Sequence, residues 1–337
     1  MRYRALGRSG AKVSELCLGT MMFGGPTSDS EARRIVDHAF DHGVNFIDTA
    51  NAYTEGRSEE TVGRTIAETR NRWIVATKVY NPMGPGINDR RLSRVHLVSA
   101  LDASLKRLKT DHVDLYYVHR VDEETPWENL VATFGNFIAQ GKIREWGLSN
   151  VRGWQIALVC DLCRQMNVPR PAALQPYYNL LNRQPEVELL PAAAHYGIGV
   201  VPYSPIARGV LSGKYSLNAT PLTGSRAGRQ DKRMLETEWR PESLEIAGKL
   251  KAHVDARGIG LVPWAVAWVL NNRTVSSTIA GPRTFEQWES YLPALSYAWT
   301  KEDEDIVDSL VTPGHASTPG YNDPAYPLTG RFSRLTG

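Results

Sequence analysis

The 337-residue chain is predicted to fold as an α/β protein of the (β/α)8 TIM-barrel class. Short β-branched or aromatic segments alternate with amphipathic segments of helix length along most of the chain. Eight strand-like segments in one chain favour a closed parallel barrel. An open doubly wound sheet would usually show G-x-G-x-x-G after its first strand, and the residues at 19–25 do not fit that spacing. The barrel is therefore the predicted fold.

The predicted strands are short and separated by the predicted helices. The strands are Leu16–Gly19, Phe46–Thr49, Ile74–Lys78, Val113–Val118, Glu145–Leu148, Ala173–Gln175, Gly199–Pro202 and Thr278–Ala280. The helices include Asp29–His42, Ser58–Arg70, Arg94–Leu108, Pro126–Gln140, Trp154–Met166 and Glu186–His195. Capping residues support three helix starts: Ser28 or Asp29 for the first, Ser58 with Thr61 for the second, and Ser93 for the third.

Two segments near the first and last strands interrupt the alternation. Tyr3–Leu6 and Lys12–Ser14, on either side of Gly7–Gly10, predict an N-terminal β-hairpin that plugs the bottom of the barrel. Leu211–Arg240 is too long for an ordinary connection. We interpret it as a lid or cofactor-clasping loop rather than a disordered insertion, because long ordered loops on rigid scaffolds usually carry function.

The chain ends in a C-terminal extension, residues 312–337, that is rich in Pro and Gly. It carries Tyr321, Tyr326 and Phe332. The sequence leaves two alternatives open, a segment folded back over one face of the barrel and a loose tail. Neither this extension nor the long loop resembles a separate domain, so we expect residues 1–337 to form one domain.

Composition excludes several classes of function. With 42% hydrophobic and 22% charged residues, the chain has the composition of an ordinary globular protein. A net charge of +3 gives no reason to expect a nucleic-acid partner. No run of eighteen apolar residues predicts a membrane span, and the first four residues lack the apolar core of a signal peptide. The oligomeric state cannot be predicted, since no helix shows a surplus apolar face.

The three cysteines predict free thiols in a reducing compartment, and hence a cytoplasmic protein. Cys160 and Cys163 form a C-x-x-C, but they fall inside a predicted helix. No second cysteine pair or histidine cluster completes a metal site. We therefore favour buried helix thiols over a redox or zinc role, and expect no metal.

Four ionisable residues stand at or just after the ends of successive predicted strands, where barrel active sites are built. They are Asp48, Tyr53, Lys78 and His119. Each alone is more often structural than catalytic, but chance rarely supplies an anion, a phenol, a cation and an imidazole together. Lys78 could stabilise a phenolate and lower the pKa of Tyr53 from its usual value of about 10.

This set of groups suits proton transfer to a carbonyl oxygen. Tyr53 would donate the proton, Asp48 would hold Lys78 charged, and His119 would direct the carbonyl by a hydrogen bond. None of the four can supply a hydride, so reduction would need a cofactor. An aldolase or isomerase that uses Lys78 as a Schiff base is an alternative, but it explains only the lysine.

The sequence resembles the aldo-keto reductases over nearly its whole length. It is most similar to the branch that holds the potassium-channel β-subunits and related bacterial reductases. The matching motifs are residues 43–50 (GVNFIDTA) with Tyr53, 76–78 (ATK), 101–108, 113–116 with His119, 141–144 (GKIR), 147–150 (GLSN) and 203–215 (YSPIARGVLSGKY).

The resemblance implies a catalytic tetrad of Asp48, Tyr53, Lys78 and His119, and an extended NADP(H) without a glycine-rich phosphate loop. It implies that Ser149, Asn150 and Gln175 bind the carboxamide and that Tyr203 stacks on the nicotinamide. The remaining implied cofactor contacts are Thr20, Met21, Asp48, Ser204, Pro205, Ile206, Ala207, Arg208, Lys214, Arg226, Gly281, Arg283 and Gln287.

The family match implies NADPH-dependent reduction of an aldehyde or ketone, a reversible reaction. Lys214, Arg226 and Arg283 suit a 2′-phosphate, which favours NADPH over NADH. Two departures from the channel-subunit pattern, Ser290 and Tyr291, weaken the expectation for adenine contacts. The imidazole of His119 replaces the amide of the channel subunits, which favours a working reductase.

A different class of function is an NADPH-binding, redox-sensing module that docks on a partner protein. The family makes this alternative plausible, but no partner-binding segment is visible in the sequence. The carbonyl substrate itself cannot be named. Side chains just past the strand ends, Phe23, Tyr80, His119 and Arg120 with Pro82, Met83 and Trp127, are the candidates for a largely aromatic or apolar pocket wall.

Overall fold

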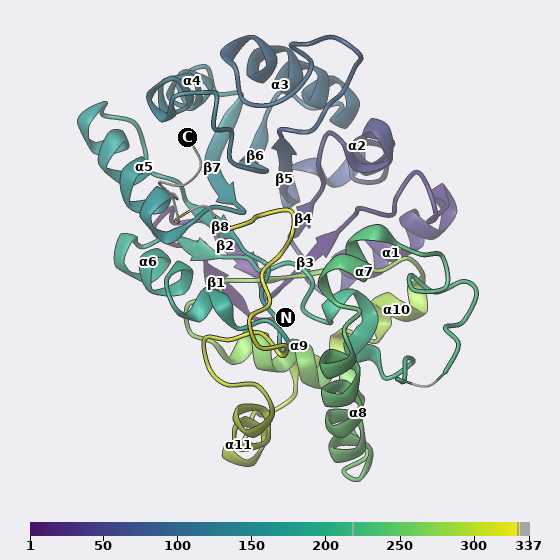
Figure 1. The fold of residues 1–337 in the computed structure, drawn as a ribbon. Helices are drawn as coiled ribbons and strands as arrows, with labels where there is room; N and C mark the ends of the chain where they lie inside the picture. Colours follow the sequence, from purple (N-terminus) through teal and green to yellow (C-terminus); the bar gives the residue numbers. More distant parts are fainter. Residues whose placement is uncertain (218, 329, 331–337) are drawn as a thin grey trace.

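Eight parallel strands form one curved sheet at the centre of the computed structural model, which describes residues 1–217, 219–328 and 330 (Figure 1). Their order in the sheet is β10-β3-β4-β5-β6-β7-β8-β9. They are β3 (Leu16–Gly19), β4 (Phe46–Asp48), β5 (Ile74–Val79), β6 (Val113–Val118), β7 (Ile143–Ser149), β8 (Ala173–Gln175), β9 (Gly199–Val200) and β10 (Thr278–Ala280). All eight fall on the predicted segments.

The two edge strands of the sheet meet and close it into a barrel. The Ser276 amide donates a hydrogen bond to the Val200 carbonyl at 2.8 Å, and the Ile279 amide donates to the Pro202 carbonyl at 3.0 Å. Closure leaves the eight-stranded sheet, as the structure describes it, without a free edge. The predicted (β/α)8 barrel is therefore confirmed.

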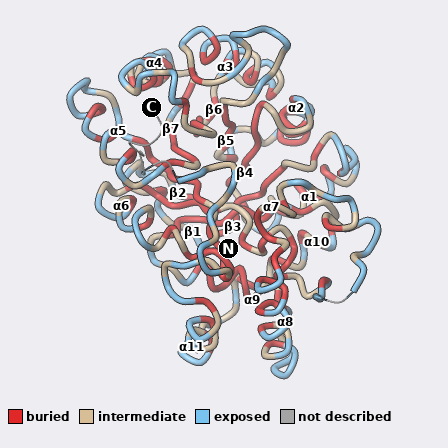
Figure 2. The backbone as a smooth tube through the Cα atoms, viewed as in Figure 1, coloured by how far each residue is buried: buried red, intermediate tan, exposed pale blue. Residues whose placement is uncertain are grey.

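Helices lie around the barrel, and each has a buried face (Figure 2). They are α1 (Asp29–Asp41), α2 (Arg57–Thr65), α3 (Arg94–Leu108), α4 (Trp127–Ala139), α5 (Gly153–Gln165), α6 (Leu189–Tyr196), α7 (Lys232–Thr237), α8 (Pro241–Asp255), α9 (Leu261–Asn271), α10 (Phe285–Glu289) and α11 (Lys301–Leu310). Of these, α8 and α11 project away from the strands (Figure 2). Five short 3-10 helices lie at Tyr53–Gly56, Ala67–Arg72, Gln184–Glu186, Ala207–Ser212 and Leu292–Leu295. Among the described residues, no helix is long and apolar enough to span a bilayer.

Two of the three predicted helix caps are confirmed. The Ser28 hydroxyl accepts a hydrogen bond from the Glu31 amide, and the Ser93 hydroxyl accepts one from the His96 amide. The Ser58 cap was wrong, because α2 begins one residue earlier, after Gly56 in the left-handed region at φ 92°. The buried Ser58 hydroxyl instead donates to the Thr20 carbonyl at 2.8 Å, which ties α2 to the end of β3.

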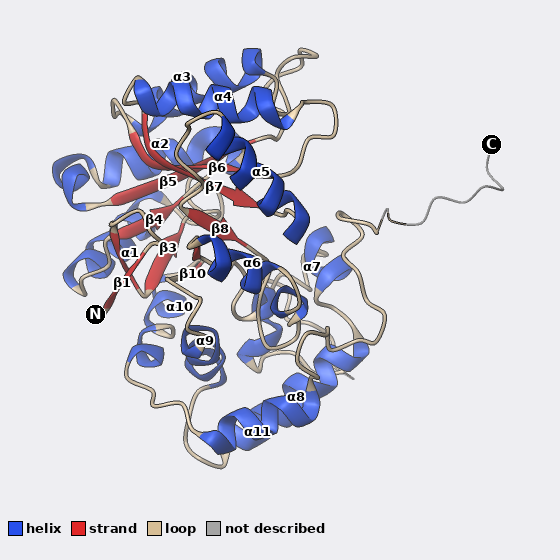
Figure 3. Ribbon diagram, turned by 90° about the vertical axis from the view of Figure 1, so that its left-hand side faces the viewer, coloured by secondary structure: helices blue, strands red, loops and turns tan. Residues whose placement is uncertain are grey.

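The N-terminal hairpin forms as predicted and closes the end of the barrel where the strands begin. It pairs β1 (Tyr3–Ala5) with β2 (Lys12–Ser14), at the opposite end of the barrel from α7 (Figure 3). Leu6 and Val13 of this hairpin join the barrel's inner apolar core, whose other members are Cys17, Phe46, Ala76, Leu115, Tyr117, Ala173, Val201 and Ile279. A second, larger core lies between the strands and the helices. The barrel interior is therefore sealed from below by apolar side chains.

The long loop and the C-terminal extension are both ordered where the structure describes them. Tyr215 and Ala227 of the loop are buried, and the loop contains the short helix α7. Residues 312–328 fold back over the barrel rather than forming a loose tail, in yellow in Figure 1. The Arg183 amide donates to His315 and the Ser317 amide to Leu181 along this path. Phe332 lies outside the described residues.

Two glycines of the hairpin turn allow a test of how tightly it plugs the barrel. Both are in the left-handed region, where a side chain costs about 1 kcal/mol. A Cβ on Gly7 would also lie 2.5 Å from the Gly197 carbonyl oxygen, whereas Gly10 has open space around it. In thermal unfolding, Gly7→Ala should lower the melting temperature clearly more than Gly10→Ala does. Equal losses would mean that the hairpin packs loosely on the barrel.

Candidate active site

Strand register brings Asp48 and Lys78 together inside the upper end of the barrel. Asp48, the last residue of β4, pairs with Ala76 of β5. Lys78 lies two residues further along β5, so its side chain points to the same face as that of Ala76. Both charged side chains are buried, with 2% and 0% of the side chain exposed. A buried ion pair of this kind needs a full set of hydrogen-bond partners.

The Lys78 ammonium donates to three acceptors. These are a carboxylate oxygen of Asp48, the Thr49 carbonyl at 2.7 Å and the Tyr53 hydroxyl at 3.2 Å. The second carboxylate oxygen of Asp48 accepts from the Gln175 amide at 2.9 Å. The ammonium and both carboxylate oxygens are thus held in fixed positions, and the phenol of Tyr53 is the outermost member of the set.

The pKa shifts of this group differ from the sequence-based expectation. Burial, the largest effect, raises the pKa of Tyr53, and the nearby Lys78 charge lowers it by less. The phenol therefore holds its proton more tightly in the protein than in water, contrary to the expected net decrease. For Lys78, burial acts to lower the pKa, but Asp48 and Tyr53 outweigh it and the pKa is raised. The lysine is charged and the tyrosine is protonated at neutral pH.

His119 follows β6 directly and faces the Tyr53 ring. The two ring centroids are 6.0 Å apart in an edge-to-face arrangement of 80°. Burial, and then the charges of Lys78 and Arg120, hold the pKa of His119 well below its usual value, so the imidazole is neutral. The Asn81 amide nitrogen lies 3.4 Å from Nδ1. An amide that donates to Nδ1 leaves Nε2 as the N–H donor, pointing the other way.

Asn81 was missed by the sequence analysis. It stands just past the end of β5, so the criterion that found Lys78, a polar residue at a strand end, could have found it too.

The residues assigned to the carboxamide form a second polar network. The Ser149 hydroxyl donates to the Gln175 carbonyl at 2.8 Å, and the Tyr203 hydroxyl donates to Asn150 at 2.9 Å. Asn150 adopts a left-handed φ of 56°, and its amide donates to the His119 carbonyl at 2.9 Å. The Tyr203 ring stacks on Tyr177, with 5.7 Å between centroids. The network therefore connects the ends of β6, β7, β8 and β9.

The basic residues expected along the cofactor lie in and near the long loop. Arg226 donates to Asp231 at 3.0 Å, and burial, the largest effect, lowers its pKa. Arg283 donates to the Gly224 carbonyl at 3.1 Å, which connects the segment after β10 to the loop. Lys214 lies over the Tyr215 ring at 5.1 Å. Arg226 and Arg283 thus have acceptors within the long loop, whereas Lys214 contacts an aromatic ring.

The other residues expected to contact the cofactor differ in their exposure to solvent. The Thr20 hydroxyl is fully buried and donates to the Asp48 carbonyl at 3.0 Å. Pro205 and Ala207 are buried, whereas Met21, Ser204 and Ile206 are partly exposed. Gln287 accepts from the Arg283 amide at 2.9 Å. Gly281 is exposed, with open space around its Cα. Ser290 and Tyr291 are the two positions that depart from the channel-subunit pattern. Tyr291 is buried, and the Ser290 hydroxyl donates to the Gln287 carbonyl.

A buried polar cluster beside Arg208 was not predicted. Glu238 is fully buried, and its carboxylate lies 4.0 Å from Nε of Arg208. Among the described residues, neither of these groups has a hydrogen-bond partner, and the same holds for the Tyr177 hydroxyl. Burial, the largest effect, raises the pKa of Glu238. No local motif marks Glu238 as a site residue, because its position follows from how the long loop packs.

The candidate pocket residues differ in exposure. Phe23 is fully buried in the outer core, while Tyr80 and Arg120 are half-buried at the barrel mouth. The Arg120 guanidinium carbon lies 5.5 Å from the ring centroid of Tyr326, which belongs to the C-terminal extension. The extension therefore contributes an aromatic residue next to the expected pocket.

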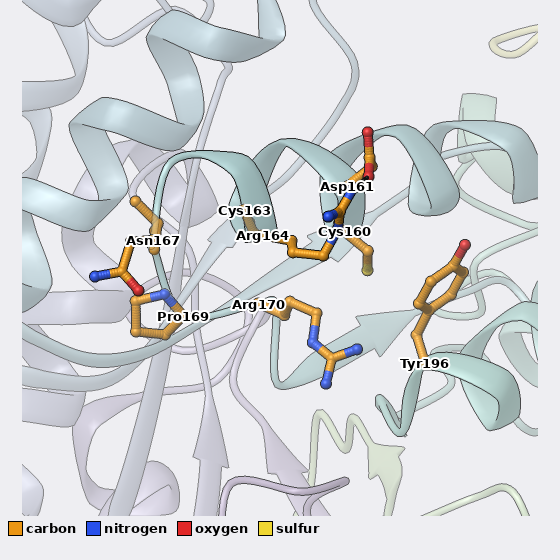
Figure 4. Close-up of a pocket in the computed structure, with 9 residues that line it drawn as sticks. Cys160, Asp161, Cys163, Arg164, Asn167, Pro169, Arg170 and Tyr196 are labelled. Carbon is orange, nitrogen blue, oxygen red and sulfur yellow. Dashed lines mark hydrogen bonds and ion pairs between the residues drawn. The ribbon is translucent and has the colours of Figure 1, made fainter.

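The C-x-x-C lies at the other end of the molecule. Cys160 and Cys163 border a cavity of about 670 Å³ that Arg164, Arg170 and Tyr196 also line, near the start of β8 (Figure 4). Both thiols are unpaired, and burial, the largest effect, raises their pKa values to about 11 and about 12. In the described part of the chain, no group of three or more His, Cys, Asp or Glu residues could hold a metal ion.

Comparison with known proteins agrees with the geometry. The model of the aldo/keto reductase family matches residues 15–312. The chain is 37% identical over 331 residues to the uncharacterized oxidoreductase YrpG of Bacillus subtilis (strain 168), which covers 95% of this chain and 98% of that protein. It is 37% identical over 300 residues to a probable voltage-gated potassium channel subunit beta of Arabidopsis thaliana, covering 88% and 91% of the two chains. The protein of the same name from Oryza sativa subsp. japonica is 35% identical over 328 residues, covering 95% and 100%.

The neutral state of His119 predicts a pH dependence of stability. Its folded pKa lies well below 6.5, so below about pH 6.5 the unfolded chain binds a proton that the folded chain does not. Folding stability should therefore fall as the pH drops, by up to about 1.4 kcal/mol per pH unit from this residue. Between pH 7.5 and pH 5, the melting temperature of His119→Asn should fall by less than that of the wild type. His195→Asn, at an exposed position of α6, controls for the loss of an imidazole, and an identical loss in wild type and His119→Asn would contradict the assignment.

Proposed function

We propose that this chain, which belongs to the aldo/keto reductase family, reduces an aldehyde or ketone to the alcohol with NADPH. Family membership makes it an oxidoreductase. The observation that carries the finer proposal is the buried Lys78 ammonium, hydrogen-bonded to both Asp48 and the Tyr53 phenol. This arrangement places a protonated donor at the outer end of a fixed charge pair. A cytoplasmic setting is part of the proposal and is supported by the three unpaired thiols.

Tyr53 acts as the proton donor in this proposal. The raised pKa keeps the phenol protonated before reaction, which is the form that a donor requires. As the carbonyl carbon becomes tetrahedral, its oxygen takes the phenolic proton and Tyr53 becomes a phenolate. Lys78, 3.2 Å from the phenol oxygen, stabilises this anion, and Asp48 keeps the ammonium in place. In the reverse direction the phenolate accepts the proton from the alcohol.

His119 orients the carbonyl. Because its imidazole is neutral and Asn81 lies next to Nδ1, Nε2–H is available to donate a hydrogen bond to the carbonyl oxygen. A charged imidazolium would instead compete with Tyr53 as the acid. The lowered pKa of His119 therefore supports the assignment of the proton transfer to Tyr53.

The residues around the mouth suit a dinucleotide. When bound, the reduced nicotinamide supplies the hydride. Ser149, Asn150 and Gln175 would bind its carboxamide, and the Tyr203 ring would stack on it. The Nε atom of Arg208 is buried without a partner among the described residues, which suits a pyrophosphate oxygen. Lys214, Arg226 and Arg283 would bind the 2′-phosphate, which supports NADPH rather than NADH.

A second candidate is a redox-sensing module that binds NADPH and docks on a partner. Two relatives named as probable channel β-subunits favour it. The histidine at position 119 favours the enzyme instead. Tight NADPH binding with negligible turnover on a carbonyl panel, together with a stable complex in pulldowns, would support the module.

Removal of one oxygen atom tests the proton donor. Tyr53→Phe should lower the rate of aldehyde-dependent NADPH oxidation by about 10²- to 10⁴-fold, since positioned acid catalysis contributes this much. NADPH binding, measured by tryptophan fluorescence, should persist in the variant. Tyr196→Phe, far from the mouth, serves as the matched control. Normal turnover by Tyr53→Phe would refute the assignment.

Removal of one cation tests the choice of cofactor. Arg283→Met should weaken NADPH binding about tenfold or more, because a hydrogen bond between charged groups contributes about 1.5–3 kcal/mol. NADH lacks the 2′-phosphate, so its dissociation constant should change much less. Arg229→Met, at an exposed position of the same long loop, is the control. An equal loss of affinity for NADPH and NADH would argue against a contact between Arg283 and the 2′-phosphate.

A further inference from the structure

Arg120 is a cation beside the reacting end of the site. It follows His119 directly at the end of β6, and its charge is close enough to help lower the pKa of the imidazole. Its guanidinium carbon lies 5.5 Å from the centroid of the Tyr326 ring. Arg120 is half-buried, so its side chain is partly exposed and partly shielded from bulk water.

Three other cations at this end of the barrel have hydrogen-bond acceptors from the protein. Lys78 binds Asp48. Two nitrogens of Arg233 bind the two carboxylate oxygens of Asp323 at 3.0 and 2.6 Å, and Arg152 donates to the Tyr326 carbonyl at 2.8 Å. Within the described residues, no carboxylate lies within 4.0 Å of the Arg120 side-chain nitrogens.

Of the three acids nearest to Arg120 in sequence, two are engaged elsewhere and the third, Glu123, is exposed. The Asp122 carboxylate accepts from the Leu92 amide at 3.0 Å and from the Thr125 hydroxyl at 2.7 Å. Glu124 forms an ion pair with Arg91. The fold therefore directs Asp122 and Glu124 to other partners, and no described carboxylate forms an ion pair with Arg120.

Tyr326 keeps this guanidinium at the mouth. Its carbonyl accepts from Arg152, and its amide donates to the Asp323 carbonyl at 2.9 Å. A guanidinium that contacts an aromatic ring can still direct its planar N–H groups at a carboxylate. Arg120 is thus ordered without using its hydrogen-bond donors on a protein acceptor among the described residues.

We propose that Arg120 binds an anionic oxygen group of the substrate, so that the substrates are aldehydes or ketones that carry a carboxylate or a phosphate. The inference rests on the proposed function. His119 and Tyr53 hold the carbonyl end, and the adjacent guanidinium holds the anion. The partly buried position strengthens the attraction relative to a fully exposed charge pair.

Matched substrates test the proposal on the wild-type enzyme with NADPH. The value of kcat/KM should be about ten- to a hundredfold higher for 4-carboxybenzaldehyde than for methyl 4-formylbenzoate, the range for a hydrogen bond to a charged group. Glyceraldehyde 3-phosphate and glyceraldehyde form the corresponding phosphate pair and show which anion is preferred. Both preferences should decrease as the salt concentration rises.

Variants then assign the preference to Arg120. The ratio of kcat/KM for the acid to that for the ester should fall about tenfold or more in Arg120→Gln, whereas Arg120→Lys should retain part of it. Arg144→Gln, at an exposed position near the start of β7, should leave the ratio as in the wild type. Binding of terephthalate to the NADP⁺ complex, followed by tryptophan fluorescence, should weaken in parallel with the ratio.

The outcomes separate this inference from the proposed function. If neutral aldehydes are reduced as well as their anionic counterparts, the anion site is refuted and the reductase stands. If Arg120→Gln lowers kcat/KM for the acid and the ester equally, Arg120 has a structural role and the inference is again refuted. If no carbonyl is reduced, the proposed function fails, and the inference fails with it.

Discussion

The buried ion pair between Lys78 and Asp48 constrains the whole upper end of the barrel. Moving an ammonium out of water costs several kcal/mol, and only a complete set of acceptors offsets that cost. Asp48, the Thr49 carbonyl and Tyr53 provide this set, and Gln175 satisfies the remaining carboxylate oxygen. These partners come from the ends of β4 and β8 and from the residues just after β4, and Lys78 itself lies on β5. The strand register, and hence the barrel itself, is therefore what makes the charged lysine tolerable.

The barrel interior has two regions along its axis, an apolar core that stabilises the fold and a polar end that carries the candidate active site. Below the ion pair, the interior is apolar, and the hairpin seals it with Leu6 and Val13. Above it, the strand ends carry hydrogen-bonded polar side chains, among them Ser149, Asn150 and Gln175. Water and ligands can therefore approach Tyr53 only from the ends of the strands. This geometry also explains the raised pKa of Tyr53, because the phenol lies at the boundary between the two regions and is more buried than its position at a strand end suggests.

Local sequence patterns were sufficient for the strands and for α1 to α6, but they named none of the helices from α7 to α11. Of these, α9 is apolar on nearly all sides and so lacks the 3.6-residue alternation that marks a surface helix. The patterns also failed for Ser58, because Gly56 starts α2 one residue earlier. Contacts between distant segments, such as those of Glu238 and Tyr326, have no local signature. The sign of the Tyr53 pKa shift was also unpredictable, since it depends on burial.

The C-terminal extension joins the two sides of the barrel mouth. On one side, Asp323 binds Arg233 of α7 in the long loop. On the other, Tyr326 contacts Arg120 after β6 and accepts from Arg152 before α5. The loop carries the cations suited to the cofactor, and Arg120 lies where the substrate would bind. Displacement of the extension would therefore disturb both sides at once, so its contacts couple the positions of the two ligands that meet over Tyr53 in the proposed reaction.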